Sequence, residues 1–283
     1  MSENTGAADC CSAVETVTPE CLDDLIVELS KSVVASSHCT VWRGQENIEW
    51  SPYPGLYRRL VNNGFGDSCI DESLVSQYET DLFCESNGLG YYGQAGGNRL
   101  DLMVNLQHAG GATRFLDVTW DSFVALWFAT HGQNQSDDGV VYCYVVDSRY
   151  CPFPEQVETW DSITAFPPGK PVLYTPPRAN ERVKAQSAAF LTCVLNGPLS
   201  GPSVFTDPTE YSDIRRIRIR SSLKKEINEW FTTNRKMREF DLFPDFAGYA
   251  HANSQGSPFI RDADELYDGS NGVFPNRWSP ESA

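Results

Sequence analysis

The sequence predicts a single α+β domain in which a mixed central sheet is flanked by helices. Segments with apolar residues at helical spacing alternate with β-branched and aromatic runs of strand length. Neither an internal repeat nor a convincing interdomain linker interrupts this alternation, and 283 residues that are 41% hydrophobic suffice for one large core. We therefore expect a disordered leader at residues 1–17, one domain at 18–253 and a loose C-terminal tail at 254–283.

Helices are predicted where apolar residues recur every three or four positions. The first begins at Thr18, and the second covers residues 71–85 with Leu74, Tyr78 and Leu82 on one face. A later helix is apolar almost all round and must therefore be buried. The remaining expected helices cover residues 98–109, 121–130 (the apolar one) and 222–231.

Strands are predicted at short runs of β-branched and aromatic residues that end at glycine or polar residues. Arg43 lies near the end of the first such run, so we expect its side chain to emerge at a strand end. A glycine-rich mobile loop is expected at residues 88–97, and proline-rich turns at 152–177. The expected strands are residues 39–44, 113–119, 139–146, 188–195 and 214–220.

The composition limits the kinds of partner that this chain can bind. Its formal net charge of −16 opposes a non-specific grip on nucleic acid or on an anionic membrane, because such a grip needs clustered Lys and Arg. The longest apolar run, residues 123–129, is far shorter than the ~20 residues that cross a bilayer. The amino terminus also lacks the basic and then apolar pattern of a signal sequence. These observations favour a cytoplasmic protein with a small or protein partner and no membrane role.

The cysteines and histidines do not follow a metal-binding pattern. The nine cysteines include no CxxC pair, and an odd number does not fit a framework of secreted disulfides. The four histidines show neither HxH nor HxxxH spacing. We expect reduced, mostly buried thiols and no bound metal.

One basic cluster stands out on this acidic chain. Three of its arginines recur at every second position of the last predicted strand and so share one face of it. The favoured interpretation is a solvated edge strand that charge protects against aggregation. The alternative is a docking surface for nucleic acid or an acidic partner. The cluster consists of Arg215, Arg216, Arg218, Arg220, Lys224 and Lys225.

The densest functional signal lies between a predicted helix end and the strand that follows it. A Gly110-Gly111 turn joins the two and leaves the backbone free to approach a ligand. Two interpretations stay open, because Arg114 could pair with Asp117, and His108 could cap the helix through the dipole. The polar residues of this tract are Gln107, His108, Thr113, Arg114, Asp117 and Thr119.

Several motifs resemble those of the FRG-domain family. The sequence Trp42-Arg43-Gly44 is similar to the signature at the start of these domains, and residues 107–119 resemble their central QHxGxPTRLLDxT motif. Gly111-Ala112 replaces the usual Leu-Pro, which should loosen the turn that aims Thr113 and Arg114. The resemblance covers roughly residues 38–250. Its further motifs are ALxFA at residues 125–129, RxxxQxxxF at Arg182, Gln186 and Phe190, and a closing segment at 242–245.

A weaker resemblance, to the ADP-ribosyltransferases, implies a reaction. These enzymes begin with an Arg on their first core strand and continue with a strand, an AxxFA-like helix and another strand, which is the order of Arg43, 116–119, 125–129 and 139–146 here. The resemblance implies an ADP-ribosyltransferase-like fold and NAD as substrate. It also implies a role as a bacterial toxin or defence effector, with a protein favoured over nucleic acid as acceptor.

Cleavage of nicotinamide from NAD passes through a cation-like ribose, so the site must grip the dinucleotide and stabilise positive charge. The transferases usually use a late Glu, and the matching neighbourhood here offers Gln186, an amide that could instead satisfy strand ends. Glu181 or Asp117 would then supply the carboxylate. The catalytic candidates are Arg43, His108, Asp117, Glu181 and Gln186. The binding candidates are Trp42, Gly44, Tyr91, Tyr92, Thr113, Arg114 and Thr119.

Two other functions fit the same residues. A hydrolase or nuclease would use His108 as a general base and Arg114 to hold a phosphate, without NAD. A ligand sensor would bind a nucleotide and catalyse no reaction.

Overall fold

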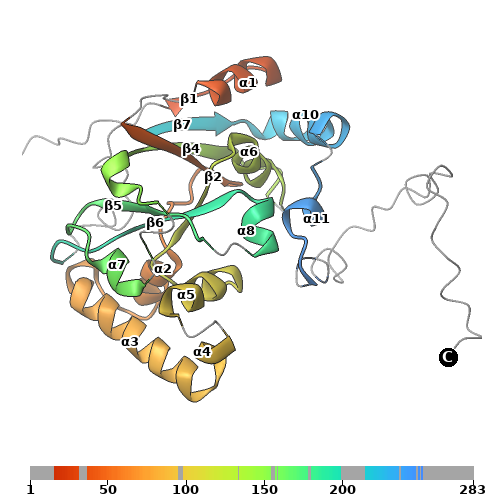
Figure 1. Cartoon of the computed structure of the whole chain (residues 1–283). Helices are drawn as coiled ribbons and strands as arrows, with labels where there is room; N and C mark the ends of the chain where they lie inside the picture. The colour runs from red at the N-terminus through yellow and green to blue at the C-terminus, as the bar shows by residue number, and fades with distance from the viewer. Residues whose placement is uncertain are drawn as a thin grey trace, which may run out of the picture.

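The described strands form one seven-stranded mixed sheet with helices packed against it (Figure 1). The strand order is β1-β7-β4-β2-β3-β6-β5, in which β1 and β7 are parallel and all other neighbours are antiparallel. This confirms the predicted α+β class. The computed structural model describes residues 16–246 except 32–36, 95–97, 133, 154–156, 158, 178–179, 199–213 and 236, together with residues 248 and 250.

All the expected strands are present, although three are shorter than predicted. The second expected strand starts at Leu116, because Thr113 Oγ1 accepts a hydrogen bond from the Phe115 N–H and holds a turn before it. The short strands β1 and β5 were not expected. The strands are β1 (Thr16–Val17), β2 (His38–Gln45), β3 (Leu116–Thr119), β4 (Gly139–Asp147), β5 (Pro171–Tyr174), β6 (Ala188–Cys193) and β7 (Ile214–Ile219).

The helices largely follow the predicted periodicity. Side-chain caps from Asp71, Asn98 and Asp121 begin three of them. The apolar helix, α6, is buried as expected. The helices are α1 (Leu22–Ser30), α2 (Gly55–Asn62), α3 (Glu72–Gly88), α4 (Tyr91–Gln94), α5 (Arg99–His108), α6 (Ser122–Thr130), α7 (Trp160–Thr164), α8 (Glu181–Ala185), α10 (Ser221–Trp230) and α11 (Glu239–Leu242). Along the described residues, no helix has the length and apolar character needed to cross a membrane.

Three local predictions were wrong. Thr16 and Val17, at the end of the predicted leader, already form β1, and the first helix starts at Leu22 rather than at Thr18. The glycine-rich loop contains the end of α3 and all of α4, and the proline-rich region contains α7 and β5. The most deeply buried residues of α3 are Val75, Glu79 and Phe83, and the predicted Leu74, Tyr78 and Leu82 are half-buried and pack against the same core clusters. Residues 1–15 and 254–283 lie outside the described residues.

β7 also differs from the prediction of an edge strand. It lies between β4 and β1, because Arg216 and Ile217 pair with Thr16 and Val17. Two of its arginines are held by carboxylates, since Arg218 pairs with Asp138 and Arg215 with Glu28. Three arginines of the basic cluster are therefore built into the sheet, whereas its two lysines lie on α10.

Two groups of helices cover one face of the sheet. Helices α1, α6 and α10 pack on β2, β4 and β7, while α3, α5 and α7 pack over β5 and β6. Trp42 belongs to the first cluster and Phe190 to the second. Strand β3 lies between β2, which carries Trp42, and β6, which carries Phe190. Its Thr119 is paired with Trp42, and its Asp117 is paired with Phe190. The side chains of Asp117 and Thr119 therefore project where the two helix groups meet.

Candidate functional site

The candidate site is centred on the seam between β2 and β3. The ladder of these strands contains a single residue pair, Trp42 with Thr119, so the strands separate beyond it. Arg43 spans the opening, donating from one Nη to the carbonyl oxygen of Asp117 at 2.8 Å and from Nε to Gln45 at 3.2 Å. Because Trp42 and Gly44 face α6, alternation along β2 places the base of the Arg43 side chain on the opposite face of the sheet.

Asp117 connects this seam to the end of α5. Its carboxylate is exposed and accepts a hydrogen bond from Gln107 Nε2 at 2.7 Å. Gln107 Oε1 in turn accepts from the buried Thr113 hydroxyl at 2.5 Å, so the amide is held at both ends. Arg43 therefore binds the carbonyl of Asp117 while Gln107 orients its carboxylate, and one carboxylate oxygen stays available to a ligand.

His108 follows Gln107 on the last turn of α5. Its ring stands edge-on to Phe190 with 6.0 Å between ring centroids. Burial lowers the pKa of His108, although the charge of Asp117 opposes this shift, so the imidazole is neutral at pH 7. In the described part of the chain, its Nε2 is buried and has no hydrogen-bond partner. A neutral imidazole beside a carboxylate can accept a proton.

The motifs at residues 182–190 and 242–245 connect to the end of α5. Arg182 holds the Asp245 carboxylate with two hydrogen bonds of 2.6 and 2.7 Å, and it donates to the His108 carbonyl at 3.1 Å. Gln186 Nε2 donates to the Leu242 carbonyl at 3.0 Å, consistent with α8 lying beside α11 in Figure 1. Gln186 thus satisfies a backbone carbonyl, one of the two roles left open for it. The sequence assigned no role to Arg182, which joins three segments around the site.

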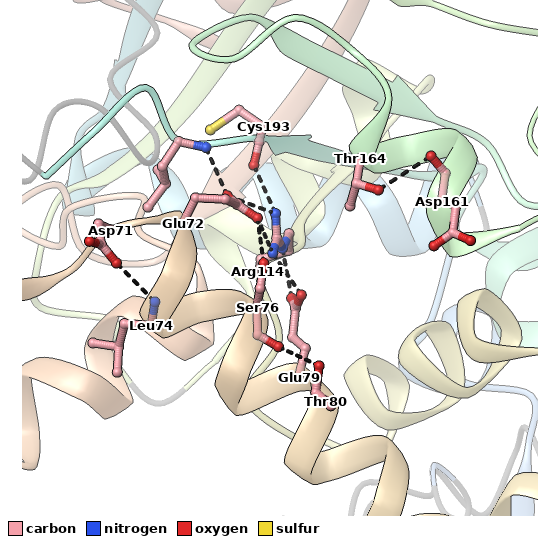
Figure 2. A network of polar contacts seen from close by, with 11 residues as sticks. Asp71, Glu72, Leu74, Ser76, Glu79, Thr80, Arg114, Asp161, Thr164 and Cys193 are labelled. Carbon is pink, nitrogen blue, oxygen red and sulfur yellow. Dashed lines mark hydrogen bonds and ion pairs between the residues drawn. The ribbon is translucent and has the colours of Figure 1, made fainter.

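Arg114 does not join this group. It is 1% exposed and forms ion pairs with Glu79 at 2.6 Å and Glu72 at 2.9 Å. It also donates to the Cys193 carbonyl, and Figure 2 shows it surrounded by these partners. The predictions that Arg114 lies in the pocket or pairs with Asp117 are therefore wrong, because the carboxylates of α3 take up its guanidinium.

Three other predicted binding residues have structural roles. Trp42 is 3% exposed in the core below α6. A Cβ on Gly44 would lie 1.7 Å from the Ala125 carbonyl oxygen, so Gly44 permits the close approach of α6 to β2. The Thr119 hydroxyl donates to the Gln186 carbonyl and accepts from the Asp121 N–H. The side chains of Trp42 and Thr119 are therefore committed to the fold, and Gly44 is required for the packing of its backbone.

The remaining candidates lie at the surface. Tyr91 is 54% exposed on α4, and nothing is described for the side chain of Tyr92 beside it. Glu181 is exposed in the first turn of α8. Of the two candidate carboxylates, Asp117 is therefore the one bonded to other predicted site residues.

One cavity of the described structure lies elsewhere. It has a volume of about 450 Å³, and none of the predicted site residues lines it. Its walls come from η2 (Ser148–Tyr150), α7 and the segments that follow them. Within the part of the chain that is described, no group of three or more His, Cys, Asp or Glu side chains could hold a metal ion.

Comparison with known proteins identifies the region that contains this site. Residues 38–138 match the family model of the FRG domain, a stretch that includes Arg43, His108 and Asp117. No curated protein and no solved structure matches the chain. Residues 38–138 are therefore similar to an FRG domain, and this stretch contributes β2, α5 and β3 to the candidate site.

Proposed function

We propose that this protein is an NAD-utilising enzyme of the ADP-ribosyltransferase type, with Asp117 as the carboxylate that stabilises the ribosyl cation. The observation that carries the proposal is the seam between β2 and β3, where Arg43 donates to the backbone carbonyl of Asp117 while Gln107 orients the exposed carboxylate of the same residue. A cationic grip for phosphate or ribose oxygens beside a carboxylate is what cleavage of the nicotinamide bond requires.

The order of elements supports an ADP-ribosyltransferase-like fold for this chain. Arg43 lies on β2, β3 ends at Thr119, α6 follows, and β4 then returns to pair with β2 along its whole length. That is the order in which the corresponding elements of the transferases occur.

His108 completes the proposed chemistry. Because burial lowers its pKa, it is neutral at pH 7 and can accept the proton of the attacking group. The attacking group would be a protein side chain in transfer, or water in hydrolysis to ADP-ribose. We propose a toxin or defence effector that acts in the cytoplasm, with a protein as acceptor. The hydrolase alternative loses support, because the buried Arg114 cannot hold a phosphate.

The test is release of nicotinamide from NAD by the purified full chain, with and without cell extract. We expect Asp117→Asn to lower kcat by about 100-fold and to leave KM nearly unchanged, because asparagine keeps the acceptor for Gln107 but carries no charge. Glu181→Gln is the matched control and should retain activity. Full turnover by Asp117→Asn would reject the assignment of Asp117, and a wild-type protein that releases no nicotinamide would reject the proposed function.

A further inference from the structure

A row of three side chains crosses the sheet at one register. Arg43 on β2 lies opposite Tyr142 on β4, and Tyr142 lies opposite Arg216 on β7. Residues in register on adjacent strands project from the same face. The row is therefore on the face opposite α6, with a phenol between two guanidinium groups.

Neither arginine of this row is neutralised. Among the described residues, no carboxylate forms an ion pair with Arg43 or Arg216, although the chain has 38 Asp and Glu residues. Their neighbours Arg215 and Arg218 on β7 are both paired. Two unpaired guanidinium groups facing one phenol would attract an anion.

The donors of the row are held in place. The Arg216 guanidinium lies over the Tyr142 ring, with its central carbon 5.6 Å from the ring centroid. Its Nε is buried and has no hydrogen-bond partner in the described structure. Burial raises the pKa of Tyr142 even though Arg216 and Arg43 oppose this shift, so its hydroxyl stays protonated. Arg43 is held through Gln45 and the Asp117 carbonyl and has one terminal nitrogen without a described partner.

The spacing of the row favours a diphosphate. Two strand intervals separate the backbones of Arg43 and Arg216 by roughly 10 Å. Two linked phosphates can reach donors on both side chains more readily than a single phosphate can.

We propose that Arg43, Tyr142 and Arg216 form a binding site for a diphosphate group across β2, β4 and β7. This proposal deepens the proposed function, because the identification of the ligand as a dinucleotide rests on that function. Arg43 lies within the FRG-domain match, whereas Tyr142 and Arg216 lie outside it. The same chemistry would also bind free inorganic pyrophosphate.

The test is calorimetric titration of the full chain with pyrophosphate, ADP-ribose and AMP, which requires no turnover. We expect pyrophosphate and ADP-ribose to bind more tightly than AMP. Arg216→Gln should raise the Kd for both diphosphates by about tenfold or more, because a hydrogen bond to a charged group is lost. Arg218→Gln removes the same charge from the same face of β7. Because that charge is already paired with Asp138, the Kd should stay within about twofold at 0.15 M salt.

Arg216→Lys and Tyr142→Phe provide a second line of evidence if Arg216→Gln folds poorly in thermal unfolding. The lysine keeps the charge without the planar fork, and both variants should weaken diphosphate binding. Equal affinity of the wild type, Arg216→Gln and Arg216→Lys, or no binding of pyrophosphate by the wild type, would overturn the proposal. Binding of pyrophosphate alone, without ADP-ribose, would keep the anion site and reject the dinucleotide. Diphosphate binding without nicotinamide release would uphold the site and reject only the proposed reaction.

Discussion

At the scale of single residues, burial separates a structural arginine from those that can meet a ligand. Arg114 is almost completely buried, whereas Arg43 and Arg216 are half-buried. Burial opposes the charge of Arg114, but the charges and hydrogen bonds of Glu79 and Glu72 outweigh it and raise its pKa. Glu79 depends on the same pair, because burial raises the pKa of its carboxyl and the charge and hydrogen bond of Arg114 oppose that rise. The ion pairs of Arg114 thus join α3 to the turn before β3.

Arg114→Met should therefore lower the free energy of unfolding by about 3–5 kcal/mol, because it leaves Glu79 buried without a counter-charge. Urea denaturation measures this loss. The matched control is Arg149→Met, which removes an ion pair with Asp147 from an arginine that is 76% exposed and should change the free energy of unfolding far less. The double variant Arg114→Met/Glu79→Met should recover part of the loss. Equal costs for the two single variants would contradict this role of Arg114.

At the scale of elements, the contact of α6 with β2 positions the seam. Gly44 lets the Ala125 carbonyl approach the β2 backbone, and Trp42 fills the space beside it. The same helix is capped by Asp121, whose N–H donates to Thr119, so the end of β3 is fixed by the helix that follows it. Arg43 lies between Trp42 and Gly44 and is thus carried by the most tightly packed strand segment of the site.

Gly44→Ala should destabilise the protein by more than ~3 kcal/mol or prevent folding, because the added methyl would overlap a backbone oxygen that cannot move alone. Thermal unfolding and circular dichroism measure this effect. Gly88→Ala is the control, since a Cβ at Gly88 meets no atom within 4 Å. A folded Gly44→Ala variant with wild-type stability and impaired NAD binding would instead restore the ligand-binding role that the sequence suggested.

At the scale of the whole molecule, two histidines make stability depend on pH. Burial lowers the pKa of His131 to about 4, although its hydrogen bond with the Trp127 carbonyl acts in the opposite direction. Burial also lowers the pKa of His108. His131 is stacked on Trp127 with 4.3 Å between centroids. The unfolded chain binds protons at these two histidines more tightly than the folded chain does. Their contribution to the free energy of unfolding is therefore fully present above pH ~6.5 and is lost as the pH decreases towards the folded pKa values.

The wild type should lose about 2 kcal/mol of unfolding free energy between pH 7 and pH 5 through His131 alone. His131→Phe keeps an aromatic ring in the stack and should remove that part of the pH dependence. Urea denaturation at each pH measures the difference, with His38→Gln at the start of β2 as the control variant. If wild type and His131→Phe lost stability in parallel, His131 would not be the group responsible.

Local patterns in the sequence were sufficient for much of the fold. The end of α5 at His108, the buried helix α6 and the strands β2, β4, β6 and β7 were predicted because their periodicity and caps are encoded within each segment. The site was predicted less completely. His108 and Asp117 are brought together by one turn, which the tract of 107–119 encodes, but Trp42 and Gly44 turned out to face the core.

The sequence by itself determined the class of fold, most of its elements and the tract that holds His108 and Asp117, because these depend on neighbours within a few positions. Only the tertiary structure decided which charged groups meet. Arg114 pairs with Glu79, which lies 35 positions away in the sequence, and not with Asp117, which lies three positions away. The row of Arg43, Tyr142 and Arg216 exists only through the pairing of β2, β4 and β7. Such choices depend on strand register and on which face is buried, and both are set by the packing of the whole chain.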